Sequence, residues 1–492
     1  MTRSAQCLAF GLLAWLATAQ VGAAAEPSPW EIPPEGSCAS ASRLRGWPLG
    51  EDAAPFELKV GEVIDGKRMQ QIQRYLPPPI WENRERFLFE GMQLEIGPCF
   101  RDYSPPASFA AATEKFRGQA HLLADGGLAD HVAGLPFPPD AIARDDSQAG
   151  AMWAWNFVSR WRAAGFRGKF RTVDLIGSSG AEPFEGEIWQ RELGWRADRA
   201  ADGYRIPDTG TLLWVAGGRF MEPFNAREFA WQQYRDVASA AEAARSDDLH
   251  MYVATMRRVR RVDSSGIDGL FVPSFSIGMS AVDPSPKAQS AEASAALGNS
   301  NSADLTTISP KRSGFEGLEL RPQFLVFRAL GTQDVLAPIN TVKAGYPAEP
   351  QRDFGPYGLS WASDRWDLRR ALVLEGVPRQ GIERGDPDLG RVELWLDLQT
   401  LYPLCYASYD ANGQPIDVGY YVGRWSEDRA EYPKDPNEGG GAPRVIDPVG
   451  EAFANLRLRA GWRRESWEFV SAPEADRAVR HAVSLKNLNK GK

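Results

Sequence analysis

Apolar and polar residues alternate along short segments over most of this chain. A period of two, with many β-branched and aromatic residues, is typical of half-buried β-strands. The segments predicted as strands are 86–96, 184–195, 211–216, 249–262, 320–330, 366–377, 392–398, 401–409 and 415–425. Asp410–Gly413, between the last two, is typical of a hairpin turn.

Helical spacing is rare. One short helix is predicted at 66–76, where three prolines end it, and a second within 145–161, with Asp146 or Ser147 as its N-cap. Strands that follow one another through short turns favour a large antiparallel sheet over βαβ units. A sheet of this size must curl, close or be covered. We therefore expect a mainly β fold, in which a curved antiparallel sheet forms an incomplete barrel with a few covering helices and long loops.

The N-terminus has the pattern of a secretory signal peptide over residues 1–25. Arg3 is its only charge, an apolar run covers Cys7–Ala17, and Ala23–Ala25 precede Glu26. The run is shorter than the roughly 20 apolar residues that a membrane-spanning helix needs. The pattern predicts an exported protein, which in a Gram-negative cell is periplasmic.

Composition divides the remainder into four parts. Residues 26–60 are rich in Pro and Gly and predict an extended arm, 61–470 one large β-domain, and 471–492 a C-terminal tail. Residues 276–314 are rich in Ser, Ala, Asn and Pro, which favours a flexible insertion; a lid over a cavity is the alternative.

Cys38, Cys99 and Cys405 remain after removal of the signal peptide. The first two lie in Pro/Gly-rich segments, whereas Cys405 lies in a predicted strand. In an oxidising compartment we expect a Cys38–Cys99 disulfide and a buried Cys405 thiol. Three isolated cysteines are the alternative.

Charge and motifs exclude several classes of function. With 64 acidic and 56 basic residues the net charge is -8, which argues against a nucleic-acid partner. The four histidines form no i,i+4 pair and no Cys-x-x-Cys occurs, so the sequence predicts no metal site and no cofactor. Ser360 in Gly358–Ala362 lacks the strand and helix of a nucleophile elbow. We expect no enzymatic activity.

Carboxylates on predicted strands leave one catalytic alternative open. A facing pair could cleave glycosides, with the 17 tryptophans as sugar platforms, although a solvated strand face is the favoured interpretation. These carboxylates are Glu90, Glu95, Glu185, Glu187, Glu393 and Asp397.

One dense basic cluster stands out in this acidic chain: Arg257, Arg258, Arg260 and Arg261. Such a cluster can contact anionic headgroups or an acidic partner. It can also protect an edge strand from pairing with another chain, and we favour this second interpretation.

The same region carries a family resemblance. Asp247–Arg261 resembles the signature Asp-x-Trp-x-Tyr-x-Pro-x-x-x-Arg-Arg-x-Arg-Arg of outer-membrane lipoprotein-sorting-like proteins, with His250 and Thr255 where that group often has Trp and Pro. Segments 352–356, 366–376 and 394–400 resemble DUF1329, an uncharacterised branch of the group. The likeness covers about 61–464.

The resemblance implies a fold similar to the LolA/LolB carriers, whose incompletely closed antiparallel barrel holds acyl chains under covering helices. It also implies a periplasmic handler of lipids or other hydrophobic molecules, with an outer-membrane barrel protein and an efflux-type exporter as possible partners. No catalytic residues come with the family.

We therefore expect non-catalytic binding or transport of a lipid or another hydrophobic molecule. Each buried CH₂ of an acyl chain contributes about 0.8 kcal/mol. The alternatives are a secreted carbohydrate-active protein and an exporter accessory subunit that binds no ligand. The candidate ligand-binding residues are Phe87, Phe89, Trp189, Trp214, Phe324, Phe327 and Trp395.

Overall fold

A computed structural model describes residues 30–38, 57–176, 179–180, 183–224, 226–227, 229–253, 257–262, 264, 269–273, 318–343, 352–382, 388–457 and 459–488. The predicted signal peptide at 1–25 and the predicted insertion at 276–314 lie outside the described residues, as does most of the predicted arm.

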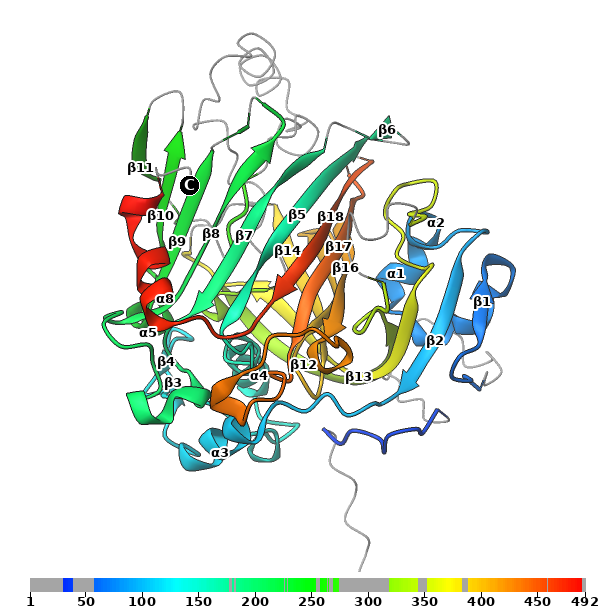
Figure 1. Cartoon of the computed structure of the whole chain (residues 1–492). Helices are drawn as coiled ribbons and strands as arrows, with labels where there is room; N and C mark the ends of the chain where they lie inside the picture. The colour runs from blue at the N-terminus through cyan, green and yellow to red at the C-terminus, as the bar shows by residue number, and fades with distance from the viewer. Residues whose placement is uncertain are drawn as a thin grey trace, which may run out of the picture.

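One curved sheet of 16 strands dominates the structure (Figure 1). Its strands are β1 (Val63–Asp65), β2 (Gln93–Cys99), β5 (Gly165–Ile176), β6 (Ser179–Gly180), β7 (Phe184–Glu192), β8 (Leu212–Glu222), β9 (Ala230–Asp236), β10 (Asp248–Val253), β11 (Arg258–Val262), β12 (Leu325–Ala337), β13 (Arg365–Pro378), β14 (Leu389–Asp397), β15 (Pro403–Asp410), β16 (Pro415–Trp425), β17 (Ile446–Asn455) and β18 (Ala460–Val470). A separate small hairpin joins β3 (His121–Leu122) to β4 (Leu128–Ala129).

The strand order is β1-β2-β13-β14-β15-β16-β17-β18-β5-β7-β8-β9-β10-β11, with β12 paired to β13 and β6 to β5. All neighbours are antiparallel except β2 and β13, which run parallel. The described part of the sheet does not close, because β11 pairs only with β10. The predicted mainly β fold, with a large curved sheet that does not close and a few covering helices, is confirmed, with one parallel pair that the sequence did not predict.

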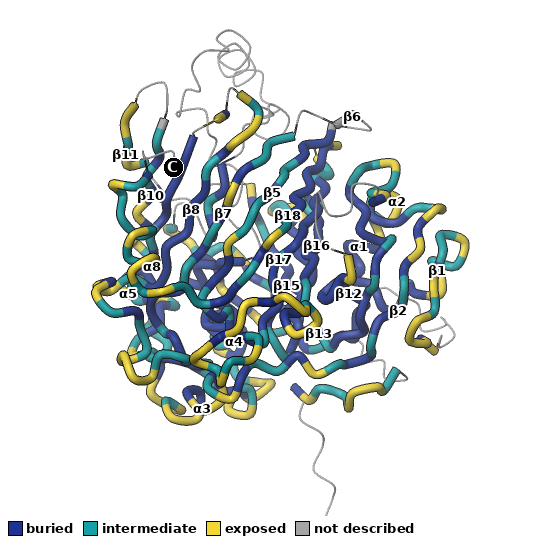
Figure 2. The backbone as a smooth tube through the Cα atoms, viewed as in Figure 1, coloured by how far each residue is buried: buried dark blue, intermediate teal, exposed yellow. Residues whose placement is uncertain are grey.

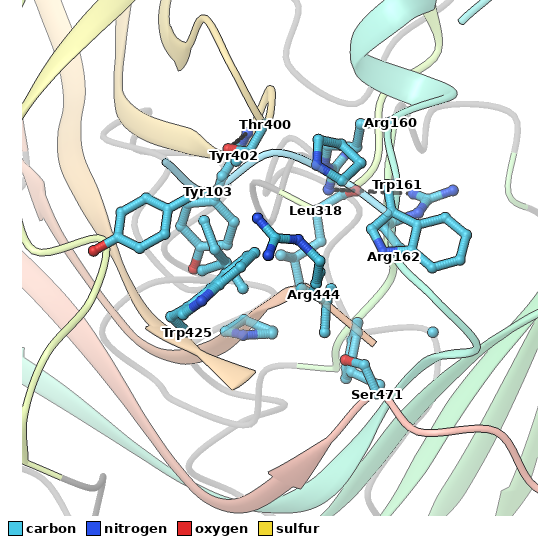
Figure 3. Close-up of a pocket in the computed structure, with 16 residues that line it drawn as sticks. Tyr103, Arg160, Trp161, Arg162, Leu318, Thr400, Tyr402, Trp425, Arg444 and Ser471 are labelled. Atoms are coloured by element: carbon cyan, nitrogen blue, oxygen red, sulfur yellow. Dashed lines mark hydrogen bonds between the residues drawn. The ribbon is translucent and has the colours of Figure 1, made fainter. Parts of the chain in front are cut away.

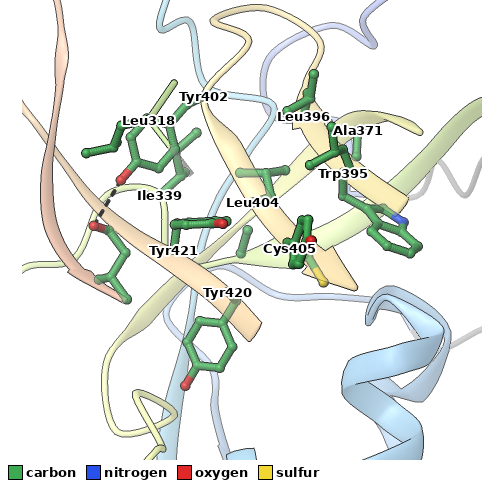
Figure 4. Close-up of a cluster of buried hydrophobic side chains, with 14 of the residues drawn as sticks. Leu318, Ile339, Ala371, Trp395, Leu396, Tyr402, Leu404, Cys405, Tyr420 and Tyr421 are labelled. Carbon is green, nitrogen blue, oxygen red and sulfur yellow. Dashed lines mark hydrogen bonds between the residues drawn. The ribbon is translucent and has the colours of Figure 1, made fainter. Parts of the chain in front are cut away.

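Both faces of the central strands are covered. Leu372, Val373 and Leu374 follow one another in β13 and all three are fully buried, although neighbouring side chains of a strand point to opposite faces. Figure 2 shows buried residues along the centre of these strands and exposed ones mainly on the covering segments and loops. In Figure 4, Tyr420 and Tyr421 of β16 point to opposite sides of the strand.

Short helices supply the covering layers. They are η1 (Gly66–Tyr75), α1 (Pro78–Glu82), α2 (Arg84–Phe87), α3 (Ala107–Lys115), α4 (Ala149–Val158), α5 (Val237–Ala241) and α8 (Asp476–Val483). α4 approaches β12 very closely, since a Cβ atom on Gly150 would lie 2.3 Å from the Phe327 carbonyl carbon. None of the described helices is long and apolar enough to cross a membrane.

Several local predictions need correction. Residues 84–87 form α2 and the strand begins only at Gln93, so 86–96 is not one strand. Within 249–262, the described residues 249–253 and 258–262 belong to two antiparallel strands, β10 and β11, rather than to a single strand. Gln148 precedes α4 without a side-chain cap, so neither Asp146 nor Ser147 is its N-cap.

Other local predictions hold. The 66–76 segment is helical, as the 3₁₀ helix η1, and β16 has the predicted bounds 415–425. In the predicted hairpin turn the Gly413 amide donates to the Asp410 carbonyl at 2.9 Å. Cys38 and Cys99 form a disulfide, with Cα atoms 5.3 Å apart, and Cys405 is a buried free thiol.

The C-terminal segment packs onto the sheet. Val479 of α8 joins a buried cluster with Leu193 and Val215, and the Tyr234 hydroxyl donates to the Val483 carbonyl at 2.6 Å. This end of the chain therefore covers the face of β8 and β9 opposite the interior described below.

Candidate functional site

Three adjoining cavities lie inside the curved sheet. The Trp425 cavity (Figure 3) has an empty volume of about 530 Å³, the Trp214 cavity about 450 Å³ and the Glu451 cavity about 340 Å³, parts of which are open to solvent. The Trp425 cavity shares Arg160, Trp161 and Arg162 with the Trp214 cavity, and Phe166, Leu318 and Tyr402 with the Glu451 cavity.

The cavities form where α4 passes into the sheet. α4 ends at Val158 and β5 begins at Gly165, so the residues 159–162 lie between helix and strand and form the shared wall. Gly165 permits this entry, because its φ is +95° and a Cβ atom there would lie 2.1 Å from the Gln190 carbonyl oxygen.

Aromatic rings make up much of the Trp425 cavity. The polar atoms of Trp161 and Tyr402 are already hydrogen-bonded to the backbone. The Trp161 indole donates to the Pro443 carbonyl at 2.8 Å, and the Tyr402 hydroxyl donates to the Val422 carbonyl at 3.1 Å. Figure 3 shows Trp425 and Tyr402 on one side and Trp161 on the other. The lining residues are Tyr103, Pro105, Arg160, Trp161, Arg162, Gly165, Phe166, Leu318, Thr400, Tyr402, Trp425, Arg444, Val445, Ile446, Pro448 and Ser471.

Three arginines and no acidic residue line this cavity within the described chain. Arg162 pairs with Glu192 at 3.0 Å and with Glu319. Arg444 pairs with Glu427 at 3.1 Å. The lining therefore combines apolar rings with cationic groups that come from two separate parts of the sequence.

Arg160 differs from the other two arginines. It is buried, and its guanidinium donates to the backbone carbonyls of Phe157 at 2.8 Å and Leu318 at 2.6 Å. No carboxylate of the described chain forms an ion pair with it. Burial holds the pKa of Arg160 well below its ordinary value, and the nearby charge of Arg162 lowers it further.

A buried polar network fixes the inner wall. Glu319 is fully buried and accepts hydrogen bonds from Arg162, from Gln190 at 2.6 Å and from Arg235 at 3.3 Å. Arg235 also pairs with Asp247 at 2.9 Å. These contacts hold the segment at 318–321 against β7 and β9, so the segment fills part of the interior.

Sequence reasoning missed this network and the cavity walls. The one signal for it was Asp247, which opens the stretch that carries the family resemblance; its partner Arg235 lies on a strand that was not predicted. Arg160 and Leu318 are 158 residues apart, and no local periodicity indicates that they meet.

The candidate ligand-binding residues do not gather in one place. Of the seven, only Trp214 lines one of the three cavities. Phe87 packs on Tyr420, with ring centroids 5.3 Å apart, and the Trp395 indole donates to Gln333.

The remaining four candidates lie at separate positions. Arg321 covers Phe324 with its guanidinium 4.4 Å from the ring centroid, and Arg191 lies 5.7 Å from the centroid of the half-buried Trp189. Phe327 packs under α4, and Phe89 is half-buried on the outer side beside the 352–362 segment.

Three of the six candidate carboxylates have a cationic or hydroxyl partner, and the six do not gather in one place. Asp397 pairs with Arg369 at 2.7 Å and Glu185 lies 3.8 Å from Arg171. Glu393 accepts from Tyr409 at 3.2 Å, and burial raises its pKa. Glu90 lies in a turn, Glu187 is exposed and Glu95 is half-buried on β2.

The basic cluster lies at the end of the sheet. Arg258, Arg260 and Arg261 are exposed on β11, the last strand in the described order, and Arg257 is exposed in the turn before it. Arg261 pairs with Asp248 of β10. The cluster therefore occupies an edge strand, as the favoured interpretation expects.

Known structures with partial similarity were found, but no curated protein matches. A lipoprotein-sorting domain from Vibrio parahaemolyticus aligns with a TM-score of 0.37 and 11% identity over 70% of this chain and 98% of its own. For a DUF1329 protein from Desulfovibrio piger the TM-score is 0.36 and the identity is 11%, over 65% of this chain and 91% of that protein. For a LolA-superfamily protein from Nitrosomonas europaea the TM-score is 0.30 and the identity is 9%, over 66% of this chain and 96% of that protein.

The family assignment rests on the sequence match. The model of the family described as "protein of unknown function (DUF1329)" matches residues 63–277 and 313–425, which is more than half of the chain. This match confirms the family that the sequence motifs indicated. The chain belongs to the DUF1329 family.

Proposed function

We propose that this protein binds a lipid or another hydrophobic molecule inside the half-barrel and carries it in the periplasm without catalysing a reaction. The observation that carries the proposal is the Trp425 cavity, with its wall of aromatic and aliphatic side chains.

The periplasmic part of the proposal has two supports. Residues 1–25 have the pattern of a cleaved signal peptide, and the Cys38–Cys99 disulfide suits an oxidising compartment. An outer-membrane barrel protein and an efflux-type exporter stay proposed partners, which the exposed Arg257, Arg258 and Arg260 would contact.

Two features favour a second function. The segment at 318–321 fills part of the interior, and an exposed basic strand ends the sheet. Both features would suit an exporter accessory subunit that docks through its arginines and carries no ligand. The two functions differ in whether the cavity is ever occupied.

Mass spectrometry of organic extracts separates them. The protein is purified from its native periplasm without detergent, beside a Val445→Phe variant that narrows the Trp425 cavity and a matched Val326→Phe variant at an exposed site on β12. We expect a stoichiometric apolar species from the wild type and Val326→Phe and much less from Val445→Phe. Empty extracts from all three folded proteins would favour the accessory subunit.

A further inference from the structure

The Trp214 cavity contains buried hydrogen-bond donors without acceptors. Ser159 Oγ, Arg162 Nε and Trp214 Nε1 are buried and have no hydrogen-bond partner among the described residues. All three residues line this one cavity. Leaving a buried polar group unsatisfied costs about 1–3 kcal/mol, so three in one cavity indicate a missing acceptor.

Arg160 adds positive charge at the same place. It lines both the Trp214 and Trp425 cavities and has no ion-pair partner in the described chain. The Phe157 ring lies under the Arg160 guanidinium, with 4.2 Å between the ring centroid and Arg160 Cζ. This contact holds the guanidinium in place. The two backbone carbonyls that it contacts leave further N–H donors of the five for another group.

The nearby carboxylate is already occupied. Glu192 lines the Trp214 cavity, and its Oε2 accepts from Arg162 at 3.0 Å while its Oε1 accepts from Gln190 at 2.9 Å. Arg196, the third arginine of the cavity, is bound to Asp198 at 2.5 Å. Arg160 and the unpaired donors are therefore the groups that remain for a ligand.

The two cavities differ in character and share a wall. The Trp425 cavity is mainly aromatic and aliphatic, the Trp214 cavity holds the unpaired donors, and Arg160, Trp161 and Arg162 belong to both. We propose that they form one site for an anionic amphiphile, whose apolar body occupies the Trp425 cavity and whose carboxylate or phosphate group binds Arg160 and the unpaired donors beside it. This inference rests on the proposed lipid-binding function.

Competition binding against a fluorescent fatty acid tests it. The competitors are myristate, myristyl alcohol and inorganic phosphate, which separate the anionic group from the chain. Since charge-assisted hydrogen bonds are stronger than neutral ones, we expect myristate to bind about tenfold or more tightly than the alcohol. We expect phosphate alone to leave the probe bound.

Variants locate the effect. We expect Arg160→Gln to reduce the preference for myristate over the alcohol to about threefold or less. Ser159→Ala, a milder change at a hydroxyl without a hydrogen-bond partner among the described residues, should lose part of the preference. Arg328→Gln, at an exposed arginine of β12, is the matched control and should keep all of it.

Each failure has a distinct meaning. A preference for myristate that persists in folded Arg160→Gln and Ser159→Ala proteins would overturn the anion site, as would equal binding of myristate and alcohol to the wild type. In both cases the lipid-binding function would stand. If phosphate binds and neither amphiphile does, the proposal that the ligand is an amphiphile would be overturned. If neither the probe nor any competitor binds, both the anion site and the lipid-binding function would be overturned.

Discussion

Replacing Glu319 with Gln tests whether the interior network holds the 318–321 segment in place. Glu319 is fully buried and accepts from Arg162, Arg235 and Gln190. In Glu319→Gln the charge is lost, and an amide N–H group faces a guanidinium N–H group. Removing one partner of a buried ion pair typically costs about 3–5 kcal/mol.

The remaining contacts set the expected magnitude. Arg162 keeps Glu192 at 3.0 Å and Arg235 keeps Asp247 at 2.9 Å, so neither arginine is left without a carboxylate. We therefore expect a loss at the lower end, about 3 kcal/mol in the free energy of unfolding. Guanidinium denaturation followed by tryptophan fluorescence measures it, provided that the slope m is unchanged.

A second glutamate on the sheet provides the control. Glu187 is exposed on β7, and we expect Glu187→Gln to change the stability by at most about 0.5 kcal/mol. A loss below about 1 kcal/mol in Glu319→Gln, with m unchanged, would refute the argument that this network fixes the interior segment.

Three further predictions concern stability. Replacing Cys38 and Cys99 with Ala should lower the free energy of unfolding by about 4 kcal/mol, because the disulfide closes a loop with a sequence separation of 61. Reduction of the wild-type disulfide should give a similar loss in denaturant titrations. Burial raises the pKa of Asp447 to about 6, so protonation of this carboxyl favours the folded state. The stability of the wild type relative to Asp447→Asn should therefore fall by about 2 kcal/mol as the pH rises from 4 to 6.5. A parallel pH dependence in both proteins would contradict this. Gly150→Ala should cost about 1–3 kcal/mol by pushing α4 from Phe327, and an unchanged melting temperature would contradict that close contact.

Alternation predicts strands well where only one face carries charge. β16 was predicted with its observed bounds, but β17 and β18 were missed. Glu451 and Arg464 lie opposite each other on these two strands and form an ion pair at 2.6 Å, with both side chains buried. Charged residues thus point inward, and the polar–apolar pattern that marks a strand is lost.

The interior site could not be predicted from local pattern. Periodicity tells which residues share a face, but it does not tell whether that face borders a cavity. That depends on which segments fill the interior. Leu318 follows residues 274–317, which lie outside the described chain, yet it contacts Arg160 after α4; this long-range pairing decides the shape of the cavity.

Photo-crosslinking tests the central claim, an interior ligand, most directly. A diazirine-labelled fatty acid is bound to the purified protein, irradiated, and the adducts are mapped by tandem mass spectrometry. We predict adducts on the walls of the Trp425 cavity, at residues such as Trp161, Tyr402 and Val445. Adducts confined to the outer layer around Phe87 and Phe89, or none above a heat-denatured control, would contradict an interior binding site.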